Sequence, residues 1–150
     1  MVIDCDTCFL KPTKFITDDG KHIFTTGTEY HIPYFEHMYK LHPLLKKHHN
    51  LSGISHHTFF HNDRVNDLIK LVEENFYNSK PFWKIYLEMI DSNHFLASGS
   101  AENEIYFNYM YYFHNNEMVI RQLNWENVNE LNNNNDNNLD FISVHWYIRK

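Results

Sequence analysis

The chain has few cysteines, no long apolar run and no obvious leader sequence. Only Cys5 and Cys8 are cysteines among the 150 residues, so no disulfide framework is implied. No stretch of about 18 apolar residues is present, so no membrane span is encoded. Asp4 and Asp6 interrupt any early apolar segment, which argues against a signal peptide. These absences predict an intracellular, cytoplasmic protein, or part of a larger product whose targeting signals lie elsewhere.

Positive charge is also scarce. Lys and Arg total 13 against 19 Asp and Glu, a formal net charge of −6. Nucleic-acid-binding surfaces are usually basic, so no nucleic-acid partner is expected. What the chain does have is apolar and aromatic side chains, 43% and 17% of the residues. At this length they suffice for one domain with a core of its own, spanning residues 1–150.

Strand-like and helix-like segments alternate along the chain, which favours an α/β fold. We expect strands at 1–5 (buried), 23–28, 118–123 and 141–147, with 51–60 a loop entering a strand. We expect helices at 33–41, from a cap at Asn62 or Asp63 to about Phe76, at 81–90, and from a cap at Ser100 to about Phe113. The Asn-rich tract 132–138 is read as a loop without an assigned function.

Asp4 and Asp6 directly follow the first expected strand. Open α/β sheets bind their ligands at the carboxyl ends of strands. Paired carboxylate oxygens suit Mg²⁺ or Mn²⁺, and such a cation suits a diphosphate. The spacing alone also fits a strand end with solvated carboxylates, one of them capping a turn through Thr7.

Residues 2–12 resemble the Asp-x-Asp strand of GT-A-type glycosyltransferases, which use nucleotide-diphospho-sugar donors. The resemblance continues from block to block, over most of the chain to about Trp125. It is to one poorly characterised GT-A-like family of bacteria, algae and giant viruses. The further segments that resemble its blocks are 26–31, 33–35, 52–57 and 98–109. The resemblance implies part of a GT-A-like mixed sheet flanked by helices.

It also implies metal-dependent transfer of a sugar from a nucleotide-sugar donor to an acceptor of unknown identity. Asp4 and Asp6 would hold Mn²⁺ or Mg²⁺, with Asp6 the more direct ligand and Asp4 reaching the ribose or a metal-bound water. His145 matches the histidine that many GT-A enzymes add as a further ligand. Its alternative role is a strand histidine packed beside Trp146.

Four residues of the 52–57 segment are candidates for contacts with the donor sugar or the acceptor: Ser52, Gly53, His56 and His57. Gly53 permits close backbone approach, and the two imidazoles can donate hydrogen bonds to hydroxyls or phosphate. Adjacent residues of a strand point to opposite faces, so at most one of the two histidines would face the site. The alternative is that one packs in the interior and the other is solvated.

Two carboxylates follow in the last block. Glu102 and Glu104 lie about 200° apart on a helix, so only one can face a cleft. Glu102, nearer the helix N-terminus, is the candidate catalytic base, and Glu104 a candidate substrate contact. A first-turn carboxylate is also favourable to the helix dipole without any catalytic role.

The resemblance begins at the Asp-x-Asp motif, whereas the family places a nucleotide-binding half before it. We therefore expect the C-terminal portion of a GT-A-like domain, lacking the N-terminal nucleotide-binding strands. A second polypeptide could supply that half. Alternatively, the chain is a non-catalytic remnant that serves as an interaction or metal-binding domain. A truncated sheet would expose an edge, which predicts poor solubility alone or association with a partner.

Cys5-x-x-Cys8 is read as two inert, semi-buried thiols. A redox pair would need a helix after the strand, and Lys11-Pro12 follows too soon for one. Half of a zinc site stays open as an alternative, because the chain has 12 histidines that could complete it.

Overall fold

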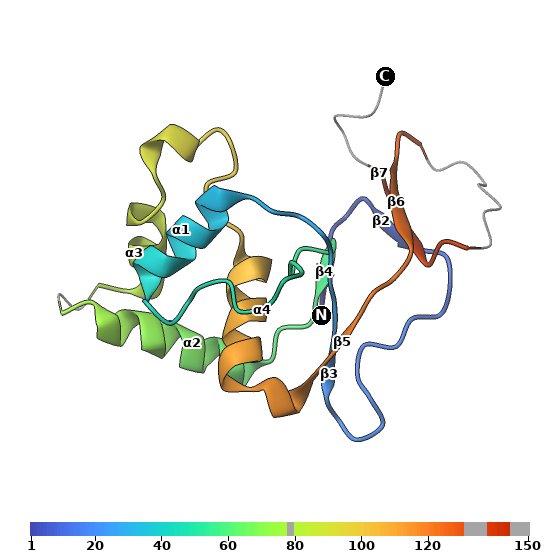
Figure 1. The fold of residues 1–150 in the computed structure, drawn as a ribbon, viewed down its shortest axis with the longest axis horizontal. Coiled ribbons are helices and arrows are strands. Elements are labelled where there is room, and N and C mark those ends of the chain that lie inside the picture. The colour runs from blue at the N-terminus through green and yellow to red at the C-terminus, as the bar shows by residue number, and fades with distance from the viewer. Residues whose placement is uncertain (78–79, 131–137, 145–150) are drawn as a thin grey trace.

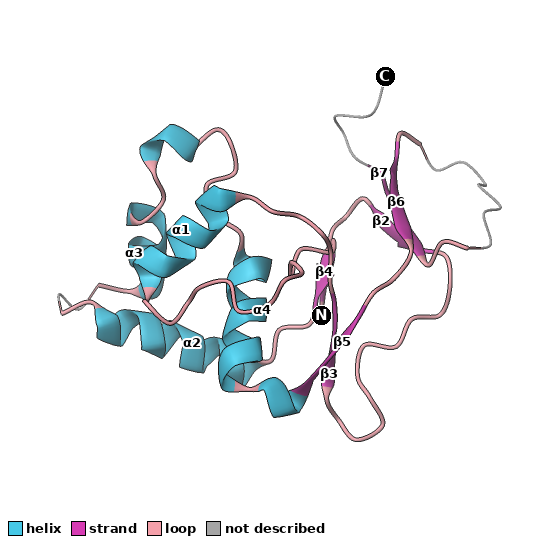
Figure 2. Ribbon diagram, in the orientation of Figure 1, coloured by secondary structure: helices cyan, strands magenta, loops and turns pink. Residues whose placement is uncertain are grey.

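The computed structural model describes residues 1–77, 80–130 and 138–144. Within these residues the protein is α/β, with its helices gathered at one end and its strands at the other (Figures 1 and 2). The helices are α1 (Ile32–Leu41), α2 (Asn62–Asn75), α3 (Phe82–Glu88) and α4 (Glu102–Phe113), with short 3₁₀ turns η1 (Ser92–His94) and η2 (Asn115–Glu117). The strands are β1 (Val2–Ile3), β2 (Thr7–Phe9), β3 (His22–Thr25), β4 (His57–Thr58), β5 (Met118–Arg121), β6 (Trp125–Val128) and β7 (Phe141–Val144).

The strands do not join into one sheet. β1 pairs with β4 and is antiparallel to it, and β3 pairs with β5 and is parallel to it. β7 lies between β2, to which it is antiparallel, and β6, to which it is parallel. The described strands thus form three small sheets, one of them mixed, and the α/β class holds at this coarse level. Each strand has only two to four residues, and the chain turns between them before a wide sheet can build up.

Helix α4 is the centre of the helical core. It is buried without interruption from Glu104 to Met110, because its sequence is apolar on nearly every side. β3 packs against it through Phe24, whose ring centroid lies 5.9 Å from that of Phe107. The other helices contribute Met38, Leu41, Leu68, Val72 and Ile85 to this core, and Leu45 and Met118 join it from outside the helices.

All four expected helices are present, within a few residues of their predicted bounds. The helix caps differ from the prediction. His61 and Ala101 are the N-cap residues of α2 and α4, and neither makes a side-chain capping bond. Asn62 already belongs to α2, and Ser100 lies one residue before the cap of α4. The short polar residues near each helix start therefore predict that a helix is present, but they do not predict its first residue.

The strand predictions were less accurate at the N-terminus. The expected buried strand over residues 1–5 is reduced to Val2–Ile3, and these side chains are 55% and 38% exposed. β1 pairs only with the two-residue β4, so among the described residues no layer covers it. Cys5 and Cys8 are exposed as well, so the expectation of semi-buried thiols is wrong. β2 and β6 were not predicted at all.

The C-terminal strand is confirmed for Phe141–Val144. The rest of its predicted range, 145–147, lies outside the described residues, as do residues 132–137 of the Asn-rich tract. Asn138 is described and lies in a turn before β7.

Candidate metal centre

The β1–β4 pair positions Asp4 beside His56. Ile3 lies opposite His57 in this ladder. One residue further on, the backbone N–H of Asp4 donates to the carbonyl of His56 at 2.9 Å. The Asp4 carboxylate Oδ2 then lies 3.1 Å from Nδ1 of His56. Two side chains separated by 52 residues in the chain are thus held together by the end of a short strand pair.

Asp6 is fixed from the other direction, by the β2–β7 pair. A tight turn joins β1 to β2, and in this turn the N–H of Thr7 donates to the carbonyl of Asp4 at 3.0 Å. The N–H of Val144 donates to the carbonyl of Asp6 at 2.8 Å, and the Ser143 hydroxyl donates to its Oδ1 at 3.2 Å. The carboxylate therefore lies where the β1–β4 and β2–β7–β6 sheets meet.

His56 has an uncommon backbone conformation for a non-glycine residue, with φ of +60°. Such a conformation costs on the order of 1–3 kcal/mol and persists only where the surroundings enforce it. The imidazole is 11% exposed. It packs edge-on against the Trp125 ring at 4.8 Å, and that indole stacks on Phe141 at 5.4 Å with 7° between the planes. These contacts orient the imidazole toward the two aspartates.

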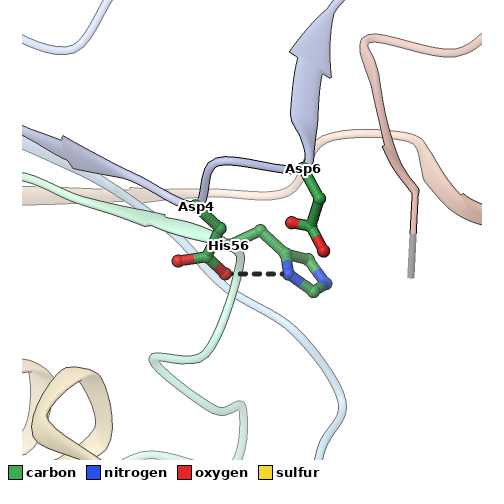
Figure 3. A group of neighbouring side chains, drawn as sticks. All are labelled: Asp4, Asp6 and His56. Carbon is green, nitrogen blue, oxygen red and sulfur yellow. Dashed lines mark hydrogen bonds and ion pairs between the residues drawn. The ribbon is translucent and has the colours of Figure 1, made fainter. Parts of the chain in front are cut away.

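Together the three side chains form a group with the composition of a metal site. One ligand atom from each of Asp4, Asp6 and His56 lies within 4.8 Å of the other two, and Figure 3 shows the carboxylates and the imidazole converging. Ligands about 2.1 Å from an octahedral cation are about 3 Å apart when adjacent and about 4.2 Å when opposite. Small side-chain rotations would thus close the group around one ion.

The donor set indicates which cations fit. Two carboxylates are hard oxygen donors that suit Mg²⁺ and Mn²⁺, whereas an imidazole favours a transition metal over Mg²⁺. Asp4 is half exposed, so it could turn without disturbing the fold. Among the residues that the structure describes, no other group of three such side chains comes this close together.

A hollow of about 400 Å³ opens beside this group. Asp6 lines it with Cys5 and Cys8 from the same segment and with Asn129 and Glu130 after β6. The hollow leaves room for a small molecule beside Asp6.

His57, the first residue of β4, lies in the interior. It is 4% exposed, and its Nε2 lies 2.9 Å from the Thr25 hydroxyl. Phenyl rings surround it, with Phe9 and Phe141 at 5.1 and 5.3 Å. Burial, aided by the positive charge of Arg121, lowers the pKa of His57 from 6.5 to about 4. His57 is therefore a neutral packing residue at physiological pH.

Ser52, Gly53 and Glu104 lie together in the interior. The Glu104 carboxylate is 1% exposed and accepts from the Ser52 hydroxyl at 2.5 Å and from the Gly53 N–H at 2.9 Å. Asn108 donates to its other oxygen at 2.9 Å, and the Lys47 ammonium lies 3.7 Å away. These bonds anchor the loop before His56 to α4. None of the three residues lines the hollow beside Asp6.

Gly53 has a steric reason to be glycine. A Cβ at this position would lie 2.3 Å from Cβ of Phe107 and 2.8 Å from the carbonyl oxygen of Asn103. The loop therefore approaches α4 more closely than any side chain would allow. This approach, together with the Glu104 bonds, sets the position from which His56 reaches the aspartates.

The other two site candidates are Glu102 and His145. Glu102 is the first residue of α4, is exposed, and lines a different cavity from Asp6. His145 lies outside the described residues. Conversely, sequence reasoning treated His56 as a substrate contact rather than a ligand, and it gave no role to Trp125. The chain offers no local signal for either, because both depend on pairing between distant strands.

No family model, curated protein or solved structure matches this chain. In the described part of the chain, no helix has both the length and the apolar character needed to span a bilayer. Functional inference therefore rests on the fold, on the geometry of the Asp4–Asp6–His56 group and on the sequence motifs.

Proposed function

We propose that this chain is a glycosyltransferase-like protein that binds Mn²⁺ or Mg²⁺ through Asp4, Asp6 and His56. The cation would in turn bind the diphosphate of a nucleotide-sugar donor. The observation that carries the proposal is the convergence of the three ligand atoms within 4.8 Å of one another. The Asp-x-Asp resemblance supplies the expected ligand, a sugar nucleotide.

The chemistry of such a site follows from its charge and coordination. Two carboxylates neutralise one divalent cation, and three protein ligands leave about three of six octahedral positions for phosphate oxygens and water. A cation in this place would offset the negative charge that develops on the departing nucleoside diphosphate. The hollow beside Asp6 gives the diphosphate an approach to the cation.

Two further parts of the proposal rest on the sequence resemblance alone. His145 follows β7 directly and is proposed as an additional ligand of the same cation. Glu102 is proposed as the base that activates the acceptor, which requires the acceptor to bind near α4. The donor half of the proposal depends on neither residue, so it can be tested by itself.

The test is calorimetric titration of the chain with UDP- and GDP-sugars, with and without Mn²⁺. The proposal expects binding that needs the metal and that Asp6→Ala abolishes. Asp18→Ala is the matched control, because that carboxylate is 95% exposed in a turn and belongs to no ligand group. A folded chain that binds Mn²⁺ but no nucleotide sugar would refute the transferase assignment.

A second candidate is a non-catalytic metal-binding or interaction domain. It is favoured by the positions of Ser52, Gly53 and Glu104, which bond to one another in the interior instead of facing the hollow. This candidate expects Mn²⁺ binding without any nucleotide-sugar binding. The same titration therefore separates the two.

A further inference from the structure

A second cavity lies among the helices and is lined by residues other than Asp4, Asp6 and His56. It has a volume of about 280 Å³ and is bordered by α2, α3 and α4. Its walls are largely apolar, and four aromatic residues contribute to them: Phe60, Phe82, Tyr86 and Tyr106. A cavity of this kind between helices, with few polar groups, is a typical place for a small organic ligand.

Among the described residues that line this cavity, Glu102 is the one acidic side chain, and none is Lys, Arg or His. The carboxylate belongs to the first residue of α4 and is exposed to solvent. Across the described residues it forms no ion pair. The described residues therefore supply no cationic partner for this negative group at the edge of an aromatic cavity.

Both tyrosine hydroxyls near this cavity remain protonated. Burial raises the pKa of Tyr86, a hydrogen bond with Ser100 opposes this, and the nearby charge of Glu102 adds to it. Burial likewise raises the pKa of Tyr106, whose hydroxyl accepts the N–H of His61 at 3.0 Å. The lining thus carries one negative charge and no compensating positive charge.

We propose that this cavity binds a small organic ammonium ion with an apolar body. The apolar body would be removed from water against Phe60, Phe82 and the aliphatic walls. The ammonium group would pair with Glu102 and lie near aromatic faces, which attract cations. A ligand carboxylate would instead meet Glu102 as a like charge. A neutral ligand of equal size would gain the apolar burial alone.

Helix N-termini carry a partial positive charge, which by itself favours an anion at the start of α4. Glu102 and Glu104 already place two carboxylates in that first turn. Of the two, Glu102 lines the cavity, so an anionic ligand there would have to approach its carboxylate. The charge of the site therefore favours a cation, and the proposal does not depend on glycosyl transfer.

The test compares three ligands of nearly equal size and different charge: 2-phenylethylamine, 2-phenylethanol and phenylacetate. Binding is followed by NMR of isotope-labelled protein at low ionic strength, with methyl shifts of Val65, Ile69 and Ile105 reporting the location. The amine should bind about three- to tenfold more tightly than the alcohol, from one partly exposed ion pair and a cation–π contribution. Phenylacetate should bind most weakly.

Two variants separate the charge from the cavity. Glu102→Gln should erase the preference for the amine over the alcohol while leaving alcohol binding in place. The matched control is Glu36→Gln, an exposed carboxylate on α1 that lies outside this lining, and it should retain the preference. Val65→Trp should weaken all three ligands together by filling the cavity.

Several results would overturn the inference. These are equal binding of amine and alcohol, tighter binding of phenylacetate, shifts that lie away from the three reporter methyls, or no binding of any ligand to the folded chain. None of these readouts uses Mn²⁺ or a nucleotide sugar. Failure here would therefore leave the proposed metal function untouched, and failure of that function would leave this inference untouched.

Discussion

The buried neutral His57 should make the fold sensitive to mild acid. Burial, and then the charge of Arg121, lower its pKa from 6.5 to about 4, so the folded chain takes up this proton only near pH 4. The unfolded chain takes it up near pH 6.5. Between these values the unfolded state binds more protons, so the free energy of unfolding falls as the pH falls. Above pH 6.5 this contribution is fully present.

The size of the effect follows from the two pKa values. Between pH 7.5 and pH 5, protonation of the unfolded imidazole should remove about 2 kcal/mol of folding stability. Toward pH 4 the loss should approach about 3 kcal/mol and then level off. These are large fractions of the total stability of a small domain, which is typically about 5–15 kcal/mol.

The assay is urea unfolding of the native chain and of His57→Gln at several pH values from 7.5 to 5. Glutamine does not titrate, and its amide can still bond to the hydroxyl of Thr25. Burial also lowers the pKa values of His22, His37 and His42, but these act equally in both proteins and cancel in the difference. The variant should lose about 2 kcal/mol less than the native chain. Equal losses in both would refute the buried, neutral placement of His57.

Three further predictions concern the loop anchor and the metal group. Glu104→Gln should lower the free energy of unfolding by about 3 kcal/mol, because an amide cannot accept all the bonds that the buried carboxylate receives; urea unfolding measures this. Gly53→Ala should cost about 1–3 kcal/mol in the same assay through its clash with Phe107. Gly20→Ala, the control, should cost only about 1 kcal/mol, since its φ is +85° but nothing lies within 4 Å of the added Cβ. His56→Asp should shift the metal preference from Mn²⁺ toward Mg²⁺ in competition titrations, because it replaces a nitrogen donor by oxygen.

Each of these three predictions has a result that would contradict it. A Glu104→Gln protein as stable as the native chain would mean that the carboxylate does not anchor the loop. If Gly20→Ala costs as much as Gly53→Ala, the contact with α4 is not the reason for glycine at position 53. An unchanged ratio of Mn²⁺ to Mg²⁺ affinity in His56→Asp would remove the imidazole from the coordination sphere.

The helices could be predicted from the sequence because their signal is local. In α2, the apolar residues Val65, Leu68 and Val72 recur at helical spacing, and Pro33 fixes the start of α1. The strands have two to four residues each, too few for a period to show. Their pairing joins residues as far apart as Thr7 and Ser143, which no local pattern reveals. For this reason the division of the described strands into three small sheets could not be predicted.

The candidate site was predictable to a similar degree. Asp4 and Asp6 follow from their spacing, and the separation of Glu102 from Glu104 follows from helix geometry. Glu104 is buried and Glu102 is exposed, as expected for two carboxylates about 200° apart on a helix. His56 as the third member of the metal group required the β1–β4 register, which brings it beside Asp4.

The most direct test of the metal centre is Mn²⁺ binding followed by electron paramagnetic resonance. The native chain and Asp18→Asn should each bind one equivalent of Mn²⁺, which lowers the signal of the free ion. The bound ion should show coupling to a histidine nitrogen. Asp6→Asn should abolish binding, and His56→Gln should remove the nitrogen coupling and weaken the affinity. A folded native chain that leaves Mn²⁺ free, or an Asp6→Asn variant that binds as the native chain does, would contradict a metal centre at Asp4, Asp6 and His56.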